Sequence, residues 1–407
     1  MKEQALFINF HPYPYFTRHG RSLLPTAEAD IRLITRNRAF GGVQGVDAKD
    51  FTQVTVVDAR YEAQWRAACD WTLDTQPVTR VMAVHERAVL FAAELRSRYG
   101  LPGTDFETAE RFRDKVLMKQ AVAAAQAAPV PDFSPLDRLD DLDDLDWTTG
   151  RWVIKSRWGL GASEVHVVDS LDAARQVCRT LDLSGSQYEI ERFVEGDIYH
   201  CDAIVQDGAV RFANVGRYTA DPAGYGPGTS FGTVTVLGGT LYDRIQALSA
   251  QVLRALGLQE GVTHLELFHT PDDELVFCEV AARPPGGIIP PVIEWQFGIN
   301  MVEVSLRQQA GLPTHVPSTQ TATAQADGVC GFVAFYPETG VRRGLAPELH
   351  TALGVVEHLH SGTDGDGRGG VRHSTDFLDS YVVRAPDEPT LLRRLQDIEV
   401  EYGTSAR

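Results

Sequence analysis

Two apolar runs on either side of a short turn constrain the fold of this chain more than any other feature. His264–Phe268 and Leu275–Val280 are typical of β-strands, and Pro271–Glu274 (PDDE) separates them. Proline followed by two aspartates favours a type I turn, so this stretch predicts an antiparallel hairpin. If the hairpin is symmetric about its turn, Glu266 lies directly opposite Glu279, with the Cβ atoms about 5 Å apart.

Two carboxylates facing each other across a ladder destabilise it unless another group neutralises them. A hard divalent cation would do so, and Mg²⁺ is the usual choice beside phosphates. The alternative is a solvated pair of glutamates, or glutamates paired with arginines. The pattern therefore indicates Glu266 and Glu279 as candidate metal ligands.

Arg283 follows the second glutamate by four residues, within the rigid segment ARPPGG at 282–287. A guanidinium held there can bind phosphate or carboxylate oxygens in bidentate fashion. Gly286 and Gly287 allow backbone N–H groups to approach a ligand closely, which makes them candidate substrate contacts. A surface arginine in a rigid turn is the alternative.

A second group of candidates lies upstream, around a glycine-containing loop. Lys155 ends a predicted buried strand, where an unpaired ammonium would be costly, and an anion is its expected partner. Gly159, Gly161 and Ser163 follow in a loop whose N–H groups could cover phosphates, although many hairpins carry such loops. The segment does not match the P-loop pattern, which needs Gly-Lys-Ser/Thr together.

The strand after this loop ends in Glu191–Gly196 (ERFVEG), which could form a hinge that packs an adenine ring; a core strand followed by a turn is the alternative. Two residues of the next strand, His200 and Asp202, alternate and therefore share a face. They are either substrate contacts or a hydrogen-bonded pair.

The order of predicted elements indicates three units. Residues 1–110 alternate strands with helices, which favours a doubly wound parallel sheet, and 111–195 and 196–407 are mixed α+β. The last part of the chain is expected to form a small α+β appendage. The predicted elements of the first unit are strands Ala5–Phe10, Asp30–Thr35, Thr52–Val57 and Arg80–Val84 and helices Tyr61–Cys69 and Glu86–Tyr99.

Four other stretches carry local predictions. Ala109–Ala127 is expected to be one helix. Leu136–Asp146 (LDRLDDLDDLD) has leucines at every third position and is expected to dock one helical stripe while its aspartates face water. Asp221–Gly232 is either a lid on the substrate side or a surface loop, and Ser361–Gly370 is an acidic, glycine-rich loop.

Composition excludes several classes of protein. The chain has 55 acidic against 38 basic side chains, a net charge of −17, which argues against nucleic-acid and anionic-membrane partners. Its five cysteines are scattered without a CxxC pair, which favours a reducing compartment over a disulfide framework or zinc site. No apolar run is long enough for a membrane span, so we expect a cytoplasmic protein.

Taken in order, these segments resemble the ATP-grasp superfamily, and within it the carboxylate–amine ligases of the L-amino-acid (dipeptide) ligase type. The resemblance covers about residues 86 to 310. The matching stretches are Arg113–Lys115 with Met118, Pro129–Pro131, Val153–Lys155, Gly159–Ser163, Glu191–Gly196, Thr263–Glu266 and Glu279–Arg283 with Gly286-Gly287.

The resemblance implies a doubly wound N-terminal (pre-ATP-grasp) domain followed by two lobes that clamp ATP. It implies ATP and Mg²⁺ as cofactors, with Mn²⁺ as an alternative metal. The residue roles that it implies are phosphate contacts by Lys115 and Lys155, a phosphate-covering loop at Gly159, Gly161 and Ser163, an adenine hinge at Glu191, Phe193 and Val194, metal ligation by Glu266 and Glu279, and catalysis by Arg283.

Two positions depart from the pattern of the family. Ala281 stands where many relatives have a metal-binding Asn, which leaves the coordination of a second metal open. Ile198 stands where many have a ribose-contacting Glu, and the neighbouring Asp197 is a candidate substitute.

The implied activity is amide or peptide bond formation through an acyl phosphate, between amino acids or related small molecules. We expect a carboxylate and an amine as partners, with a carrier protein and a second copy of the chain as further candidates. The rival functions are loading of an amino acid onto a carrier-protein thiol, nucleotide binding without catalysis, and ATP-dependent carboxylation.

Overall fold

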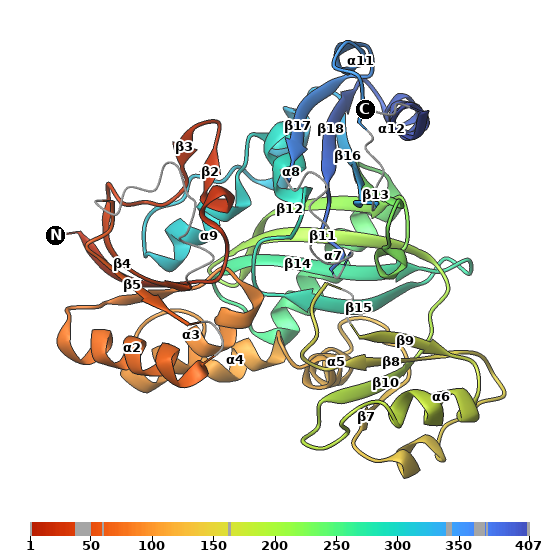
Figure 1. Cartoon of the computed structure of the whole chain (residues 1–407), viewed down its shortest axis with the longest axis horizontal. Helices are drawn as coiled ribbons and strands as arrows, with labels where there is room; N and C mark the ends of the chain where they lie inside the picture. Colours follow the sequence, from red (N-terminus) through yellow and green to blue (C-terminus); the bar gives the residue numbers. More distant parts are fainter. Residues whose placement is uncertain are drawn as a thin grey trace.

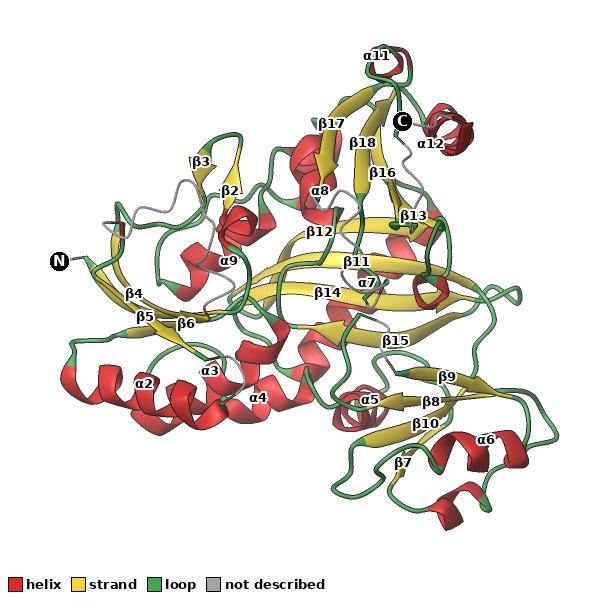
Figure 2. Cartoon of the chain, viewed as in Figure 1, coloured by secondary structure: helices red, strands yellow, loops and turns green. Residues whose placement is uncertain are grey.

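Three larger sheets organise the described part of the chain, a computed structural model that covers residues 2–36, 50–58, 61–161, 164–338, 344–361, 371 and 373–404. Figure 1 shows a parallel sheet near the N-terminus, a long curved sheet in the centre, and a small sheet below its end. Helices pack on the faces of these sheets, as Figure 2 shows by colour. The candidate site lies where the small sheet approaches the central one.

The N-terminal sheet is parallel and has the strand order β5-β4-β1-β6, as predicted. Helices α2 and α3 share a core with one face, whereas α9 (Met301–Gln309) packs on the other face through Val302 and Leu306. One covering helix therefore comes from more than 200 residues downstream of β4. The elements are β1 (Glu3–Asn9), β4 (Ala29–Arg36), β5 (Gln53–Val57), β6 (Arg80–Met82), α2 (Glu62–Thr75) and α3 (Glu86–Tyr99), with η1 (Tyr13–Phe16), β2 (Thr17–Arg18) and β3 (Arg21–Ser22) after β1.

The single helix predicted over 109–127 is wrong, because the chain forms α4 (Phe106–Arg111) and α5 (Lys115–Ala124) instead. The Asp114 carboxylate accepts hydrogen bonds from the backbone N–H groups of Val116 and Leu117. An aspartate in this position begins a new helix rather than continuing an old one. This break fixes where Lys115 lies.

The second sheet is antiparallel, with the order β7-β10-β8-β9, and α6 (Leu171–Cys178) packs against it. The helical stripe predicted over Leu136–Asp146 is wrong: Leu136 ends β7 and only η3 (Leu139–Leu142) is helical. A spacing of three is the 3₁₀ period, and the Asp141 side chain accepts from nearby backbone N–H groups in competition with a helix. The strands are β7 (Phe133–Leu136), β8 (Trp152–Ser156), β9 (Val165–Val168) and β10 (Tyr188–Arg192).

The central sheet is antiparallel and has the order β15-β14-β11-β12-β13-β16-β18-β17. Helix α7 (Thr240–Leu256) buries its apolar side against one face, and α8 (Ile289–Phe297) packs on the other. We did not predict α8, whose two prolines lie in the first turn, where a missing N–H is tolerated. The strands are β11 (Asp197–Gln206), β12 (Ala209–Tyr218), β13 (Ser230–Val236), β14 (Gly261–His269), β15 (Leu275–Ala281), β16 (Val329–Phe335), β17 (Val355–His360) and β18 (Asp379–Ala385).

The C-terminal part has the predicted α+β composition, but its strands extend the central sheet rather than forming one of their own. Helix α12 (Glu388–Thr404) covers them through Leu391, Leu395 and Ile398. The remaining short helices are α10 (Thr319–Ala324) and α11 (Leu349–Ala352). The acidic, glycine-rich loop predicted at 361–370 lies outside the described residues beyond Ser361.

The stretch Asp221–Gly232, predicted as a lid or surface loop, is shorter than expected because β13 begins at Ser230. A single 3₁₀ turn, η4 (Pro222–Gly224), starts it, and the Asp221 side chain caps that turn. Its role as a lid stays a prediction. None of the helices in the described part of the chain combines the length and apolar composition that a bilayer span requires.

Candidate active site

Glu266 on β14 and Glu279 on β15 are cross-strand partners, as the turn position predicted. The symmetric register holds from His264 to Glu266 and then shifts by one residue at a β-bulge, so Leu267 pairs with Phe277 and Cys278 is the extra residue. Burial alone would raise the pKa of Glu279, but the nearby ammonium groups of Lys115 and Lys155 lower it to about 2. The two carboxylates thus face one side of the sheet, and Glu279 is ionised.

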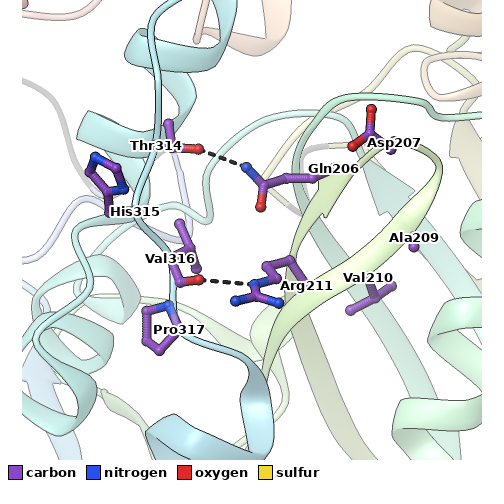
Figure 3. Close-up of a pocket in the computed structure, with 9 residues that line it drawn as sticks. All are labelled: Gln206, Asp207, Ala209, Val210, Arg211, Thr314, His315, Val316 and Pro317. Carbon is purple, nitrogen blue, oxygen red and sulfur yellow. Dashed lines mark hydrogen bonds between the residues drawn. The ribbon is translucent and has the colours of Figure 1, made fainter.

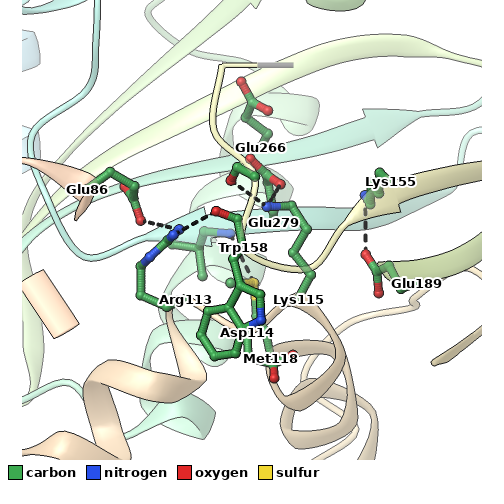
Figure 4. Close-up of polar contacts among 12 residues, drawn as sticks. Glu86, Arg113, Asp114, Lys115, Met118, Lys155, Trp158, Glu189, Glu266 and Glu279 are labelled. Carbon is green, nitrogen blue, oxygen red and sulfur yellow. Dashed lines mark hydrogen bonds and ion pairs between the residues drawn. The ribbon is translucent and has the colours of Figure 1, made fainter. Parts of the chain in front are cut away.

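Lys115 lies between these carboxylates and the glycine loop (Figure 4). Its Nζ is 3.0 Å from Oε2 of Glu279 and donates to the carbonyl oxygen of Gly159 at 3.2 Å. The Asp114 cap sets its position at the first turn of α5, and Met118 on the same helix face contacts the backbone N–H of Val280. A cation therefore already neutralises Glu279 at the place where a metal was predicted.

Lys155 is buried and paired, as expected for an ammonium at the end of an interior strand. Its Nζ lies 2.5 Å from Oε1 of Glu191 and 3.7 Å from Oε1 of Glu189. The fully buried Lys119 binds the same two carboxylates at 2.6 and 2.8 Å. Burial opposes the charge of Lys155, but Glu191 and Glu189 raise its pKa above the ordinary value.

Sequence reasoning missed Lys119 and Glu189, although a signal was present. Lys119 is four residues after Lys115 on α5, and Glu189 is two residues before Glu191 on β10, so each shares a face with a residue already chosen. The ammonium groups of two lysines and the carboxylates of two glutamates form one buried cluster of charges. Its members are Lys119, Lys155, Glu189 and Glu191. This cluster connects α5 to the second sheet.

Arg283 is held by the N-terminal domain through Glu86, the first residue of α3. Its Nε donates to Oε2 of Glu86 at 2.5 Å and one terminal N–H donates to the carbonyl of Pro284 at 2.8 Å. The other oxygen of Glu86 accepts from Arg113 at 2.8 Å, and Arg113 also donates to the carbonyl of Trp158 in the glycine loop. Burial would raise the pKa of Glu86, but the two guanidinium groups lower it.

Glu86 had not been recognised from sequence, because its partner Arg283 is 197 residues away. The bridge from Arg113 through Glu86 to Arg283 joins the N-terminal domain, the start of α5 and the end of the β14–β15 hairpin. It leaves part of the Arg283 guanidinium available to an anion.

The glycine loop and the glycines after Arg283 both lie beside the C-terminal part. Gly161 has a positive φ of +61°, and an added Cβ would lie 2.0 Å from Nε2 of His373, so a larger residue there would be strained and would displace the His373 ring. Ser163 lies outside the described residues. Gly287, also at positive φ, ends the turn before α8, with Thr375 and Phe377 as its nearest neighbours.

The predicted adenine hinge runs along the rim of the second sheet. Glu191 is buried, whereas Phe193 and Val194 are partly exposed. The Phe193 N–H donates to the carbonyl of Arg151, and the Arg151 guanidinium lies 3.9 Å from the centre of the Phe193 ring. One wall of this rim is therefore aromatic and cationic.

His200 and Asp202 were predicted to be either substrate contacts or a hydrogen-bonded pair, and the structure has them as a buried hydrogen-bonded pair. Their side chains are 1% and 0% exposed, and His200 Nδ1 lies 2.8 Å from Asp202 Oδ2. Asp202 also binds His264, which lies beside Glu266. Burial alone would lower the pKa of His264, but its hydrogen bonds to Asp202 and Glu266 raise it to about 9.

The donor set suits a hard divalent cation. Glu266 and Glu279 offer carboxylate oxygens, which Mg²⁺ and Mn²⁺ prefer, and Lys115 shows that the position accepts positive charge. A second cluster, His358, His360 and Asp379, also has metal-ligand chemistry. There, however, the Asp379 carboxylate already accepts hydrogen bonds from both imidazoles and from Tyr402, which satisfies it without an ion.

A pocket of about 810 Å³ lies at the turn between β11 and β12, remote from these groups (Figure 3). Two of its polar side chains are already bonded across it: Gln206 donates to Thr314, and Arg211 donates to the carbonyl of Val316. Gln206 is six residues along β11 from the partner of Glu266, a separation of roughly 20 Å. We assign the pocket no role in the site.

This chain is similar in sequence to known proteins. Residues 150–292 match the model of the ATP-grasp domain. The L-arginine-specific L-amino acid ligase of Bacillus subtilis is 29% identical over 243 residues, and the match spans 58% of this chain and 58% of that protein.

Solved structures extend the likeness to the whole chain. L-amino acid ligase from Bacillus licheniformis has a TM-score of 0.76 at 17% identity and covers 98% of both chains. Carboxyaminoimidazole ribonucleotide synthase from Aspergillus clavatus, complexed with ATP, has a TM-score of 0.68 at 13% identity, covering 98% of this chain and 99% of that one. At these identities the likeness establishes the fold, and it confirms the predicted architecture.

Proposed function

The chain carries an ATP-grasp domain, and on that premise we propose that it is an ATP-dependent ligase that joins a carboxylate to an amine. The substrate carboxylate attacks the γ-phosphorus of ATP, the bond from that phosphorus to the bridging oxygen breaks, and ADP leaves. The amine then attacks the acyl phosphate, forms the C–N bond, loses a proton and displaces inorganic phosphate.

The chain's own residues act mainly by alignment and charge. Lys155 and Lys115 bind phosphate oxygens, and the hinge at Glu191, Phe193 and Val194 holds the adenine. Arg283, oriented by Glu86, holds the reacting carboxylate against the γ-phosphoryl group. Because the reactants are already aligned when bound, most of the entropic cost of bringing them together is met before the chemical step.

Glu266 and Glu279 would hold Mg²⁺, which neutralises the charge that develops on the phosphate oxygens. Mn²⁺ is expected to substitute, because carboxylate oxygens suit both ions. The glycine loop at Gly159–Gly161 would cover the phosphates and exclude the water that otherwise hydrolyses an acyl phosphate.

One observation carries the proposal: two carboxylates are paired across β14 and β15, and a lysine from α5 binds one of them, at the same end of the hairpin that leads to Arg283. A nucleotide-binding module without catalysis has no need of an arginine fixed by two partners beside this pair. We propose amino acids or related small molecules as the carboxylate and the amine, which the likeness to an L-amino acid ligase supports.

The test is phosphate release from ATP across pairs of amino acids, with the product identified by mass spectrometry. We expect ADP, phosphate and a dipeptide in equal amounts. Glu279→Gln removes one metal ligand and should lower turnover by at least about 100-fold. Glu274→Gln, an exposed acid in the same hairpin, is the matched control and should behave as wild type.

Other outcomes separate the rival functions. A thioester on an added carrier protein, without free dipeptide, would replace the amine by a thiol acceptor. Nucleotide binding with no phosphate release for any pair of substrates would contradict the ligase proposal, and so would an unimpaired Glu279→Gln enzyme.

A further inference from the structure

A polar network of hydrogen-bonded side chains crosses four strands of the central sheet and ends at Glu266. Thr233 on β13 contacts His200 on β11, which binds Asp202, and Asp202 binds His264 on β14. These four side chains lie on the face that also carries the two metal-site glutamates. The ligase mechanism assigns no role to this polar network.

The register of the sheet brings these side chains together. Across the β11–β14 ladder His200 pairs with Glu266 and Asp202 pairs with His264. Across the β11–β12 ladder Asp202 pairs with Asn214, and His200 pairs with Gly216. Since side chains alternate between the two faces of a strand, all of these positions share one face.

Gly216 leaves the space that the side chains of this polar network occupy. A Cβ added there would lie 2.2 Å from Nε2 of His200 and 2.9 Å from Oγ1 of Thr233. The glycine is in extended backbone, which any residue adopts, so conformational freedom does not explain it. Space for the His200 ring does.

At one end of this polar network, two side chains contact a single oxygen of Glu266. Tyr218, on β12, donates its hydroxyl to Oε1 of Glu266 at 2.7 Å, and Nε2 of His264 lies 3.4 Å from the same oxygen. Tyr218 is 8% exposed, so its hydroxyl is screened from water. Behind them, Asn214 donates to Asp202 at 3.0 Å and fixes the carboxylate that orients His264.

We propose that Tyr218 and His264 are positioning residues that hold Oε1 of Glu266 and thereby present Oε2 to the metal ion. This inference rests on the metal role assigned to Glu266 in the proposed function. Groups behind a metal ligand fix its orientation, and their loss commonly weakens metal affinity by about 10- to 100-fold. Asp202, His200 and Asn214 act one step further back, by orienting His264.

The experiment measures metal binding and does not depend on turnover. Mn²⁺ is titrated into the protein with ADP present and free Mn²⁺ is followed by electron paramagnetic resonance, while ADP binding without metal is measured by calorimetry. Tyr218→Phe removes one hydroxyl and should weaken Mn²⁺ binding by about 10-fold or more, with metal-free ADP binding unchanged.

Tyr402→Phe is the matched control, because it also removes a tyrosine hydroxyl bonded to a carboxylate, that of Asp379. It should bind Mn²⁺ as wild type does. A second pair tests His264: Gln can place an amide near the Nε2 position and should preserve Mn²⁺ binding, whereas Asn reaches only the Nδ1 position and should weaken it.

Wild-type Mn²⁺ affinity in Tyr218→Phe would overturn the inference. Equal losses of metal-free ADP binding and Mn²⁺ binding would also overturn it, because they would indicate a general structural defect. If the ligase proposal alone fails, no substrate pair gives a product, but the Mn²⁺ and ADP binding measurements still test this inference. The failure of one proposal can therefore be distinguished from the failure of the other.

Discussion

At the scale of single residues, the site depends on side chains that orient other side chains. Arg283 is the candidate catalytic guanidinium, but Glu86 sets its direction and shares its second oxygen with Arg113. Glu86 is 6% exposed, so water does not replace its hydrogen bonds. Its contribution is therefore expected to appear in turnover.

Glu86→Gln tests this arrangement, because the amide keeps the shape of the side chain and removes its charge. Hydrogen bonds to charged groups contribute about 1.5–3 kcal/mol, so kcat/KM for phosphate release should fall by about 10- to 100-fold. Glu94→Gln, which alters an ion pair on the same helix away from the site, should have little effect. Equal activity of the two variants would show that Arg283 needs no support from α3.

Sequence reasoning found the residues that belong to local motifs and missed those that act through distant contacts. Glu266 and Glu279 pair across one hairpin, so a single turn was enough to predict them. Glu86, Lys119 and Tyr218 reach their partners across 197, 70 and 48 residues. Strand pairing and domain packing decide the contacts of Glu86 and Tyr218, which no local spacing encodes. Lys119, by contrast, was indicated by its position one turn after Lys115 on α5.

At the scale of elements, the capping residues determine where helices begin and end more than the spacing of apolar residues does. The predicted α3 begins and ends where the structure has it, because Gly100 stops it in the left-handed conformation. The helix predicted over 109–127 breaks at the Asp114 cap, and the leucine spacing of 136–145 gives only a 3₁₀ turn. In both cases an aspartate that binds backbone N–H groups overrides a run of apolar residues.

The edge of the central sheet offers a test of how one carboxylate joins three elements. Asp379 on β18 accepts from His358 and His360 on β17 and from Tyr402 on α12. Burial alone would raise the pKa of Asp379, but these hydrogen bonds lower it below the ordinary value of 3.8. Its contribution to stability is thus full above about pH 4 and is lost as the pH falls through the folded-state pKa.

Asp379→Asn should lower the free energy of unfolding by about 1–3 kcal/mol at neutral pH. Urea unfolding at about pH 7, 5 and 3.5 should give equal deficits at the first two and a smaller deficit at the last. Asp397→Asn, exposed on α12, is the control and should match wild type. A deficit that grows as the pH falls would contradict the assigned direction.

At the scale of the whole molecule, the site is assembled from parts that are far apart in the chain. Helix α3 of the N-terminal domain supplies Glu86, helix α5 supplies Lys115, the second sheet supplies Lys155, and the central sheet supplies Glu266 and Glu279 (Figure 4). Helix α9 ties the first and last of these together by packing on the N-terminal sheet. The order of motifs predicted this fold, whereas the packing of α9 required coordinates.

We propose that Glu266 and Glu279 together bind one divalent cation beside the phosphates of a nucleotide. A crystal of the protein grown with ADP and Mn²⁺ tests it directly through the anomalous signal of the metal. We expect a peak within about 2.2 Å of one oxygen from each glutamate, with Oε1 of Glu266 still bonded to Tyr218. A nucleotide bound with its metal peak away from both glutamates would contradict it.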